Sequence, residues 1–296
     1  MQMDTKIILE NVCKDYGSKR ALNQINLTIE KGMFGLLGPN GAGKTTMMKV
    51  LTTLLQKTSG KITMCGIPIE KSKQIRSMVG YLPQEFSMYG TMSVYEGMDY
   101  LAVLSGVSKN QRKERIMELL QKVNLEDCTK KKIKTLSGGM KRRMGIAQAL
   151  LHNPRVLIVD EPTAGLDPEE RVRFRNLLCE VAQDRIVLLS THIVGDIEAT
   201  CEKIAVLQEG NLLYDGTVTR LLKEAEGAIF QTEISRMELE KVKSHYFVTG
   251  MVSQGQKVQI RFIDEEKQQF PFLNAEKCMP NVEDAYLYLI HKKEMR

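Results

Sequence analysis

Residues 38–45 read GPNGAGKT and match the pattern G-x-x-x-x-G-K-[ST], a loop that cradles phosphate groups. Glycines let such a loop wrap closely around an anion, and the positive end of the helix that follows adds to the attraction. Residues 33–37 are apolar and predict a strand, and apolar positions return at helical spacing over residues 46–55. The alternative is an ordinary glycine turn, which the flanking strand and helix disfavour. This stretch therefore predicts a strand, a phosphate loop and a helix.

The polar side chains of this loop have expected roles. Lys44 is expected to reach the β- and γ-phosphates of a nucleotide, and Thr45 offers a hydroxyl to Mg²⁺. Thr46 supplies another donor at the start of the same helix. The residues of the loop expected to contact the nucleotide are Gly38, Asn40, Gly41, Gly43, Lys44, Thr45 and Thr46.

A second chemical signal is an acidic pair. Residues 155–161 read RVLIVDE, which places two carboxylates at the carboxyl end of an apolar strand, where ligands collect in open α/β sheets. Asp160 is expected to hold Mg²⁺ through a water molecule, opposite Thr45, and Glu161 to polarise the attacking water as a general base. An isolated pair would more often end a strand in a turn, but the phosphate loop upstream favours the catalytic interpretation.

Composition limits the classes of protein to which this chain can belong. Of its 296 residues, 43% are hydrophobic and 26% are charged, which is typical of a globular chain and excludes low complexity. No apolar run approaches the length that crosses a bilayer, and no signal peptide is recognised, so a peripheral location on the cytoplasmic side of the membrane is expected. The six cysteines form no Cys-x-x-Cys pair, which disfavours zinc and redox sites.

Apolar periodicity predicts the architecture of the larger part of the chain. Residues 156–159 and 186–189 are continuous apolar runs, typical of parallel strands buried on both faces. Residues 93–125 instead have helical periodicity. We therefore expect an α/β fold: a P-loop NTPase core with an antiparallel β subdomain and a helical insertion over about residues 86–152, within a domain of residues 1–219.

The chain changes character after this domain. Residues 220–296 hold twelve basic and twelve acidic residues, so the formal net charge of +6 lies within the preceding part. Residues 258–262 alternate in polarity, and residues 282–290 have helical periodicity. These patterns predict a small α+β accessory domain at the C-terminus.

The order of the motifs resembles a known family. Residues 135–140 read TLSGGM before an apolar-periodic helix, so a serine hydroxyl and glycine N–H groups are offered to an anion at a second helix start. Alone, this segment would be a capped helix start. Between the phosphate loop and the acidic strand, it resembles the signature motif of the ATP-binding-cassette (ABC) ATPases, and the resemblance covers residues 1 to about 220. It implies ATP and Mg²⁺ as cofactors and ATP hydrolysis as the activity.

The resemblance implies roles for further residues. Tyr16 resembles the aromatic residue that stacks on adenine, the alternative being a buried tyrosine at a sheet edge. Gln84 resembles the glutamine that joins the Mg²⁺ site and senses the membrane partner, the alternative being a surface glutamine. His192 matches the switch histidine that contacts the γ-phosphate. The expected metal ligands are then Thr45, Gln84 and Asp160, and the expected catalytic residues are Glu161, His192 and Lys44.

The resemblance also implies a dimer. In this family the signature motif acts in trans, so Ser137, Gly138 and Gly139 of one copy would cover the ATP held by Lys44 of another. Residues 165–168, GLDP, resemble the loop that touches the opposite subunit, the alternative being a turn at a helix start. Two copies would make two sites, so a second nucleotide-binding subunit, forming a homodimer, is an expected partner.

Without a membrane span, the chain is expected to be the ATPase subunit that powers a separate membrane permease. It most resembles bacterial export-type and drug-resistance subunits, which share YLPQE at residues 81–85 and LSGGMKRR at residues 136–143, so export is the expected direction. The alternative is a soluble cassette ATPase acting on ribosomes or DNA, which the single phosphate loop and the lack of a zinc motif disfavour. A generic P-loop kinase would leave the signature motif unexplained. Nucleic acid is not an expected partner, because no aromatic residues interleave the basic runs.

Two further predictions concern coupling and assembly. Residues 84–105 are expected to form the groove that accepts a short permease helix, with apolar contacts from Phe86, Met88, Tyr89 and Met92. The alternative is that these side chains fill the core of the helical insertion. The C-terminal domain is expected to stabilise the dimer or regulate ATP turnover, unless its aromatic helix only completes that domain's own core.

Overall fold

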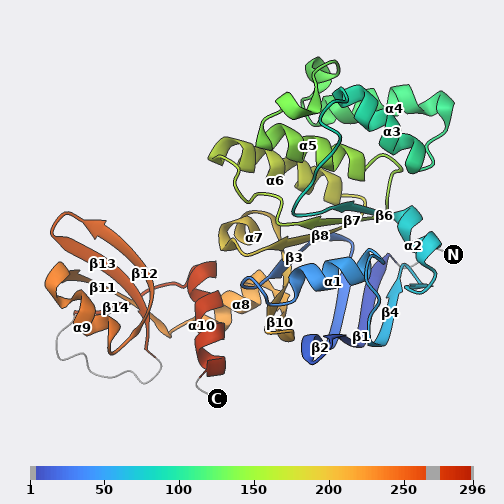
Figure 1. Ribbon diagram of the computed structural model, residues 1–296. Helices are drawn as coiled ribbons and strands as arrows, with labels where there is room; N and C mark the ends of the chain where they lie inside the picture. The colour runs from blue at the N-terminus through green and yellow to red at the C-terminus, as the bar shows by residue number, and fades with distance from the viewer. Residues whose placement is uncertain (1–4, 265–273, 295–296) are drawn as a thin grey trace. The chain divides into compact units, whose positions relative to one another are not determined.

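The computed structural model describes residues 5–264 and 274–294 (Figure 1). The chain divides into two compact units, residues 1–215 and residues 216–296. The first unit combines an antiparallel sheet, a largely parallel sheet and seven helices among its described residues, so the prediction of an α/β fold is confirmed.

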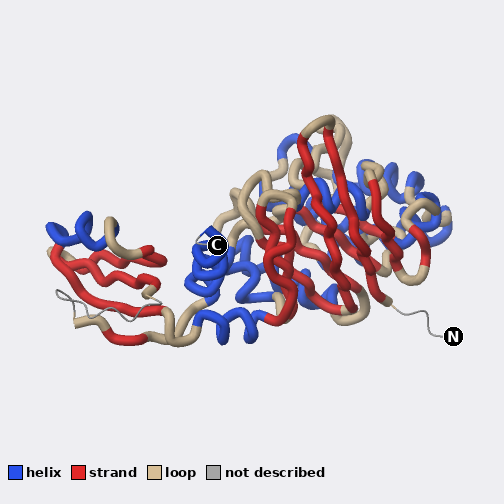
Figure 2. The backbone as a smooth tube through the Cα atoms, turned by 90° about the horizontal axis from the view of Figure 1, so that it is seen from below, coloured by secondary structure: helices blue, strands red, loops and turns tan. Residues whose placement is uncertain are grey.

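The first unit contains two sheets, whose strands appear in Figure 2. The antiparallel sheet has the order β2-β1-β4-β5, with β1 (Lys6–Tyr16), β2 (Lys19–Glu30), β4 (Ser59–Met64) and β5 (Ile67–Pro68). The second sheet has the order β10-β9-β3-β8-β7-β6, with β3 (Gly32–Leu37), β6 (Val79–Leu82), β7 (Val156–Asp160), β8 (Ile186–Thr191), β9 (Lys203–Gln208) and β10 (Asn211–Thr217). Every residue of β7 and β8 is buried, as their continuous apolar runs predict.

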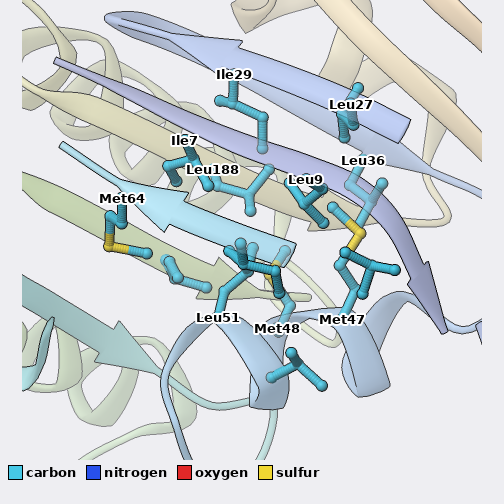
Figure 3. Packing of buried hydrophobic residues seen from close by; sticks show 14 of the residues in the cluster. Ile7, Leu9, Leu27, Ile29, Leu36, Met47, Met48, Leu51, Met64 and Leu188 are labelled. Carbon is cyan, nitrogen blue, oxygen red and sulfur yellow. The ribbon is translucent and has the colours of Figure 1, made fainter. Parts of the chain in front are cut away.

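Helix α1 (Lys44–Leu51) packs against both sheets (Figure 3). Its buried side chains Met47, Met48 and Leu51 share one core with residues of the two sheets, namely Ile7, Leu9, Leu27, Ile29, Leu36, Met64 and Leu188. Each fully buried side chain of this kind stabilises the fold by about 1.5–3 kcal/mol, so the core holds the loop before α1 in place.

The prediction that this helix continues to residue 55 is wrong. The helix ends at Leu51, and Thr53 adopts a left-handed φ of 59° that no helix continues. Leu54 therefore leaves the helical face, and its side chain is 61% exposed.

The region with helical periodicity forms separate helices. Helix α3 (Val94–Leu104) begins at a capping box, in which Glu96 N donates to Ser93 Oγ at 3.2 Å and Ser93 N donates to Glu96 Oε2 at 2.6 Å. Gly106, with a φ of 75°, interrupts the periodic segment before α4 (Lys109–Lys122). The other helices of this unit are α2 (Ser72–Met78), α5 (Gly138–Ala149), α6 (Pro168–Ala182) and α7 (Val194–Thr200), with 3-10 turns at Glu126–Cys128 and Ile133–Thr135.

The second unit is an antiparallel sheet with helices, in agreement with the α+β pattern of its sequence. The sheet has the order β12-β13-β11-β14, with β11 (Ile229–Ser235), β12 (Phe247–Gln254), β13 (Lys257–Ile263) and β14 (Glu276–Lys277). Its helices are α8 (Val218–Ala225), α9 (Leu239–Lys243) and α10 (Val282–Glu294), with a 3-10 turn at Arg236–Glu238. Phe230 and Phe262 stack within its core, and the Tyr246 ring packs at a tilt against Phe262.

Candidate nucleotide-binding site

The glycine-rich loop between β3 and α1 forms a cradle around the Lys44 side chain. The Lys44 ammonium is 4% exposed and donates to the carbonyl oxygens of Gly38 at 2.7 Å and Pro39 at 3.2 Å. Glycine is required at Gly38, because a Cβ there would lie 2.3 Å from the carbonyl oxygen of Leu207. Gly43 precedes the helix with a φ of 107°, which favours glycine. The loop therefore places a buried cation beside backbone N–H groups at a helix start.

Lys44 also faces the acidic pair at the end of β7. Its Nζ lies 3.5 Å from Oε1 of Glu161, and burial lowers the pKa of Lys44, while the carboxylates of Glu161 and Asp160 oppose that shift. The ammonium is thus removed from bulk water and compensated mainly by Glu161. A multiply charged anion in the cradle would therefore stabilise the charged form of Lys44.

The Glu161 carboxylate is the centre of a cluster from three strand ends. Nε2 of Gln84 donates to its Oε2 at 3.1 Å, and Nδ1 of His192 lies 3.2 Å from its Oε1, where Lys44 also approaches. The backbone of Glu161 has a φ of 46°, and its N–H donates to the carbonyl oxygen of Ser190 at 2.9 Å. A non-glycine residue with positive φ is strained, and such strain concentrates at functional sites. The structure brings Lys44, Gln84, Glu161 and His192 together around one carboxylate.

Asp160 provides a test of whether the site suits Mg²⁺. The side chain is fully buried, and neither carboxylate oxygen makes a hydrogen bond to the described residues. Burial raises the pKa of Asp160, although the hydroxyls of Ser190 and Thr45 lie near enough to oppose the shift. A buried carboxylate whose pKa stays raised despite these hydroxyls is costly to hold ionised unless a cation compensates it. The donor set of Thr45, Gln84 and Asp160 offers the oxygen ligands that Mg²⁺ prefers, so these residues fit the ion.

A pocket of about 620 Å³ lies over this cluster. The pocket is lined by most of the loop residues that are predicted to contact a nucleotide. The predicted adenine-stacking residue and two residues of the carboxylate cluster line it as well. These lining residues are Tyr16, Asn40, Gly41, Gly43, Lys44, Thr45, Thr46, Gln84 and Glu161. Gly38 and His192 contact the cluster without lining the pocket, and Asp160, next to Glu161 in the chain, does not line it either.

Tyr16 ends β1 at the rim of this pocket. Its side chain is 48% exposed, and the Lys14 ammonium lies 5.2 Å from the centroid of its ring. The alternative of a buried edge tyrosine is therefore wrong. An exposed ring at the rim of a phosphate pocket is available to stack on a base.

Charged residues that no sequence motif indicates also line the pocket, namely Lys19, Arg20 and Glu209. Lys19 and Arg20 follow the hairpin turn after Tyr16, and Nε of Arg20 donates to Oδ1 of Asp15 at 2.8 Å. Glu209 also lines the pocket, from the turn between β9 and β10. That turn reaches the loop because Gly210 N donates to the carbonyl oxygen of Ala42 at 2.9 Å. Because Lys19 and Arg20 are basic and lie close in sequence to Tyr16, their position could have indicated that they line the pocket. No motif near Glu209 in the sequence indicates that it lines the pocket.

The signature motif lies apart from this pocket within one chain. Ser137 caps α5, because its Oγ accepts from the Met140 N–H at 3.1 Å. Ser137 and Gly138 are exposed, and Gly138 has open space where a Cβ would lie. None of Ser137, Gly138 and Gly139 lines the pocket that holds Lys44.

Comparison with known proteins agrees with this geometry. A family model described as ABC transporter matches residues 22–164. The chain is 37% identical over 227 residues to the uncharacterized ABC transporter ATP-binding protein YxlF of Bacillus subtilis (strain 168), covering 76% of each chain. The chain belongs to the ABC transporter ATP-binding proteins. The resemblance carried by its motifs is therefore confirmed, and this protein is an ABC ATPase.

Two other relatives of this ABC ATPase have more specific names. The linearmycin resistance ATP-binding protein LnrL of Bacillus subtilis (strain 168) is 36% identical, with 76% of this chain and 74% of the relative covered. The Nod factor export ATP-binding protein I of Burkholderia orbicola (strain AU 1054) is also 36% identical, with 75% and 74% covered.

Solved structures match the ABC ATPase over its cassette. A structure titled as the ATP-binding subunit of an ABC transporter has a TM-score of 0.68 and 27% identity, with 74% of this chain and 93% of that chain covered. A dimeric post-hydrolysis state of the ATP-binding cassette MJ0796, bound to ADP and Pi, has a TM-score of 0.65 and 26% identity, with 71% and 98% covered. Among the described residues of the ABC ATPase, no helix has both the length and the apolar character needed to cross a membrane.

Proposed function

We propose that this ABC ATPase hydrolyses ATP with Glu161 as the general base and powers a separate membrane exporter. The observation that carries the proposal is the buried Glu161 carboxylate in contact with Lys44, Gln84 and His192. A carboxylate held at the mouth of a phosphate cradle can accept a proton from water that attacks the γ-phosphate. Lys44 would bind the β- and γ-phosphates, and His192 would contact the γ-phosphate.

Nucleotide binding would change the partners of Glu161. Lys44 now divides its donors between Gly38, Pro39 and Glu161. Phosphate oxygens carry more negative charge than these groups, so Lys44 would turn to them and leave Glu161 free to accept a proton. Mg²⁺ would supply positive charge that neutralises the phosphates, and Thr45, Gln84 and Asp160 would hold it.

A homodimer would complete the site. Ser137 and Gly138 at the start of α5 are exposed and lie outside the pocket of their own chain. Their hydroxyl and N–H groups suit the phosphates of a nucleotide held by a second copy. The dimeric state of the cassette MJ0796 with ADP and Pi supports this arrangement.

The membrane partner would dock on a groove of about 490 Å³, lined by Leu54 and Leu104 among others. These two side chains are 61% and 66% exposed. Phe86 and Met88 are half-buried beside the helices of the insertion, because a Cβ at Gly145 would lie 3.1 Å from the Phe86 ring and one at Gly97 would lie 3.4 Å from Met88. These two side chains therefore fill part of the space within the insertion and keep part of their surface exposed.

The direction of transport is proposed as export, at the cytoplasmic side of the membrane. Relatives named for linearmycin resistance and Nod factor export support export as the direction. The same names support a role in transport over a soluble role at ribosomes or DNA. The test is purification of the tagged full chain from solubilised membranes. A permease present in equal amount would support the proposal, and ribosomal proteins or DNA in its place would contradict it.

A matched pair of variants makes this test specific to the groove. Leu54→Asp and Leu104→Asp together should lose the permease while keeping nucleotide binding, because the groove does not include Lys44. Met117→Asp, at a 38% exposed side chain of α4 outside the groove, is the control and should keep both.

A further inference from the structure

The sheet of the C-terminal unit has one edge that no described residue covers. Strand β12 ends the sheet order and pairs with β13 along its length. No described residue makes a backbone hydrogen bond to its other side. Helix α10 reaches only the first half, where the Phe247 ring lies 4.7 Å from that of His291 and Oγ1 of Thr249 donates to Asp284 at 2.6 Å. The outer half, residues 251–254, is open along this edge.

Both faces of this outer half are exposed. Successive side chains of a strand point to opposite faces, so Met251 and Val252 lie on different sides of the sheet. They are 50% and 59% exposed, and Ser253 and Gln254 are exposed as well. A strand added beside β12 would therefore meet an apolar side chain on each face.

The edge also lacks charge. Strand β12 reads FVTGMVSQ, with no Lys, Arg, Asp, Glu or Pro, and its bulge between Val248 and Gly250 lies in the half next to α10. Proteins usually protect an exposed edge with charged residues or proline. The opposite side of the sheet is different: β11 carries Glu233, and β14 consists of Glu276 and Lys277.

We propose that β12 pairs with β12 of a second copy of this chain, antiparallel about a two-fold axis, so that two C-terminal sheets join into one. A two-fold pairing brings each strand beside an identical strand, so a charge on β12 would face its like, and the neutral sequence avoids that repulsion. Because one strand pair buries little area, it would strengthen a dimer that the cassettes also form. In that respect the inference rests on the proposed homodimer.

Disulfide formation between single cysteines tests the pairing directly. In the full chain with Cys179→Ser, which removes the exposed thiol, Met251, Val252 and Ser253 are changed to cysteine one at a time. Pairing holds at least one of these thiols near its twin, so nucleotide-free dimers should cross-link about tenfold faster than from Met237→Cys. Met237 is 93% exposed in the same unit and is the control. Rates equal to the control at all three positions would overturn the proposal.

Charge exchange separates pairing from a folding defect. Val252→Lys and Val252→Glu should each weaken self-association of the nucleotide-free chain by about tenfold, because like charges would meet across the axis. An equal mixture of the two variants should associate at least as well as the unchanged chain. Met237→Lys should have no effect. Unchanged association of both variants, or weakening that the mixture does not reverse, would overturn the proposal.

A comparison with ATP distinguishes this inference from the proposed function. With ATP, the Glu161→Gln chain that also carries Cys179→Ser and the fastest cross-linking of the three β12 cysteines should form both the cassette dimer and the β12 disulfide. A dimer that depends on ATP but lacks the disulfide would overturn the strand pairing alone. A disulfide without any ATP-dependent dimer would support the pairing and contradict the composite nucleotide site.

Discussion

At the scale of single residues, the site depends on groups that only the fold brings together. Lys44 and Glu161 are far apart in the sequence, yet their charged atoms lie 3.5 Å apart. The sequence motifs identified both residues, because a phosphate loop needs a lysine to bind phosphates and hydrolysis needs a carboxylate to activate water. They could not show that Glu161 accepts contacts from Lys44, Gln84 and His192 at once, since that depends on the register of β6, β7 and β8.

Tyr16 gives the first test at this scale. Tyr16→Ala should weaken ATP binding by about 1–3 kcal/mol, because stacking between a base and an aromatic ring contributes that much. Tyr16→Phe keeps the ring and should bind ATP nearly as well as the unchanged chain. Titration with a fluorescent ATP analogue measures both, and equal dissociation constants for the alanine and phenylalanine variants would exclude stacking.

Asp160 gives the second test. Asp160→Asn keeps the size of the side chain but removes the charge that a buried divalent cation would balance. The variant should need a much higher Mg²⁺ concentration for ATP hydrolysis, while ATP binding without Mg²⁺ should be unchanged or stronger. Mg²⁺ titrations at fixed ATP measure the shift, and the same Mg²⁺ requirement in both chains would contradict the assignment.

At the scale of elements, Asp284 attaches α10 to the sheet of the C-terminal unit. Its carboxylate accepts from Nε of Arg261 at 3.0 Å and from Oγ1 of Thr249 at 2.6 Å, and it is 1% exposed. Burial alone would raise the pKa of Asp284, but hydrogen bonds from Arg261, Thr249 and Asn281 lower it overall. A folded-state pKa below the unfolded value contributes stability above the unfolded pKa, and that stability is lost as the pH falls through the folded pKa.

The prediction for this element is a pH-dependent loss of stability. Asp284→Asn should destabilise the C-terminal unit by about 3 kcal/mol at neutral pH, because it leaves a partly buried guanidinium without its partner. The difference from the unchanged chain should begin to shrink below about pH 4, the pKa of an unfolded aspartate, and should disappear as the pH falls through the lower folded-state pKa. Urea unfolding followed by circular dichroism measures it, and a difference that does not vary with pH would exclude the ion pair as the cause.

Elements with a strong pattern could be predicted from the sequence, and those decided by backbone conformation could not. The buried strands β7 and β8 contain uninterrupted apolar runs, which are typical of parallel strands covered on both faces. Helix α1 instead ends at Leu51, before the predicted end at residue 55, because Thr53 adopts a left-handed conformation. No pattern of side chains predicts that conformation. The wall of the pocket at Glu209 depends on a turn that packs against Ala42, a contact between distant segments.

At the scale of the whole molecule, each complete nucleotide site should need two copies of the chain. A heterodimer with Lys44→Ala and Ser137→Ala on the same subunit should have both sites damaged, because each site takes Lys44 from one copy and Ser137 from the other. With the two changes on different subunits, one site is damaged twice and the other is intact. Nucleotide retained per dimer by filter binding measures the difference, and retention by the first arrangement only would show that the motifs act within one chain.

ATP hydrolysis by Glu161→Gln decides whether Glu161 is the general base. The variant keeps the phosphate cradle, so it should bind Mg·ATP as tightly as the unchanged chain and accumulate as an ATP-bound dimer. Its turnover should fall about a hundredfold or more, because the general base is lost. The control, Glu202→Gln, changes an exposed carboxylate outside the pocket and should hydrolyse ATP normally. Near-normal steady-state hydrolysis by Glu161→Gln would contradict the assignment of Glu161 as the base.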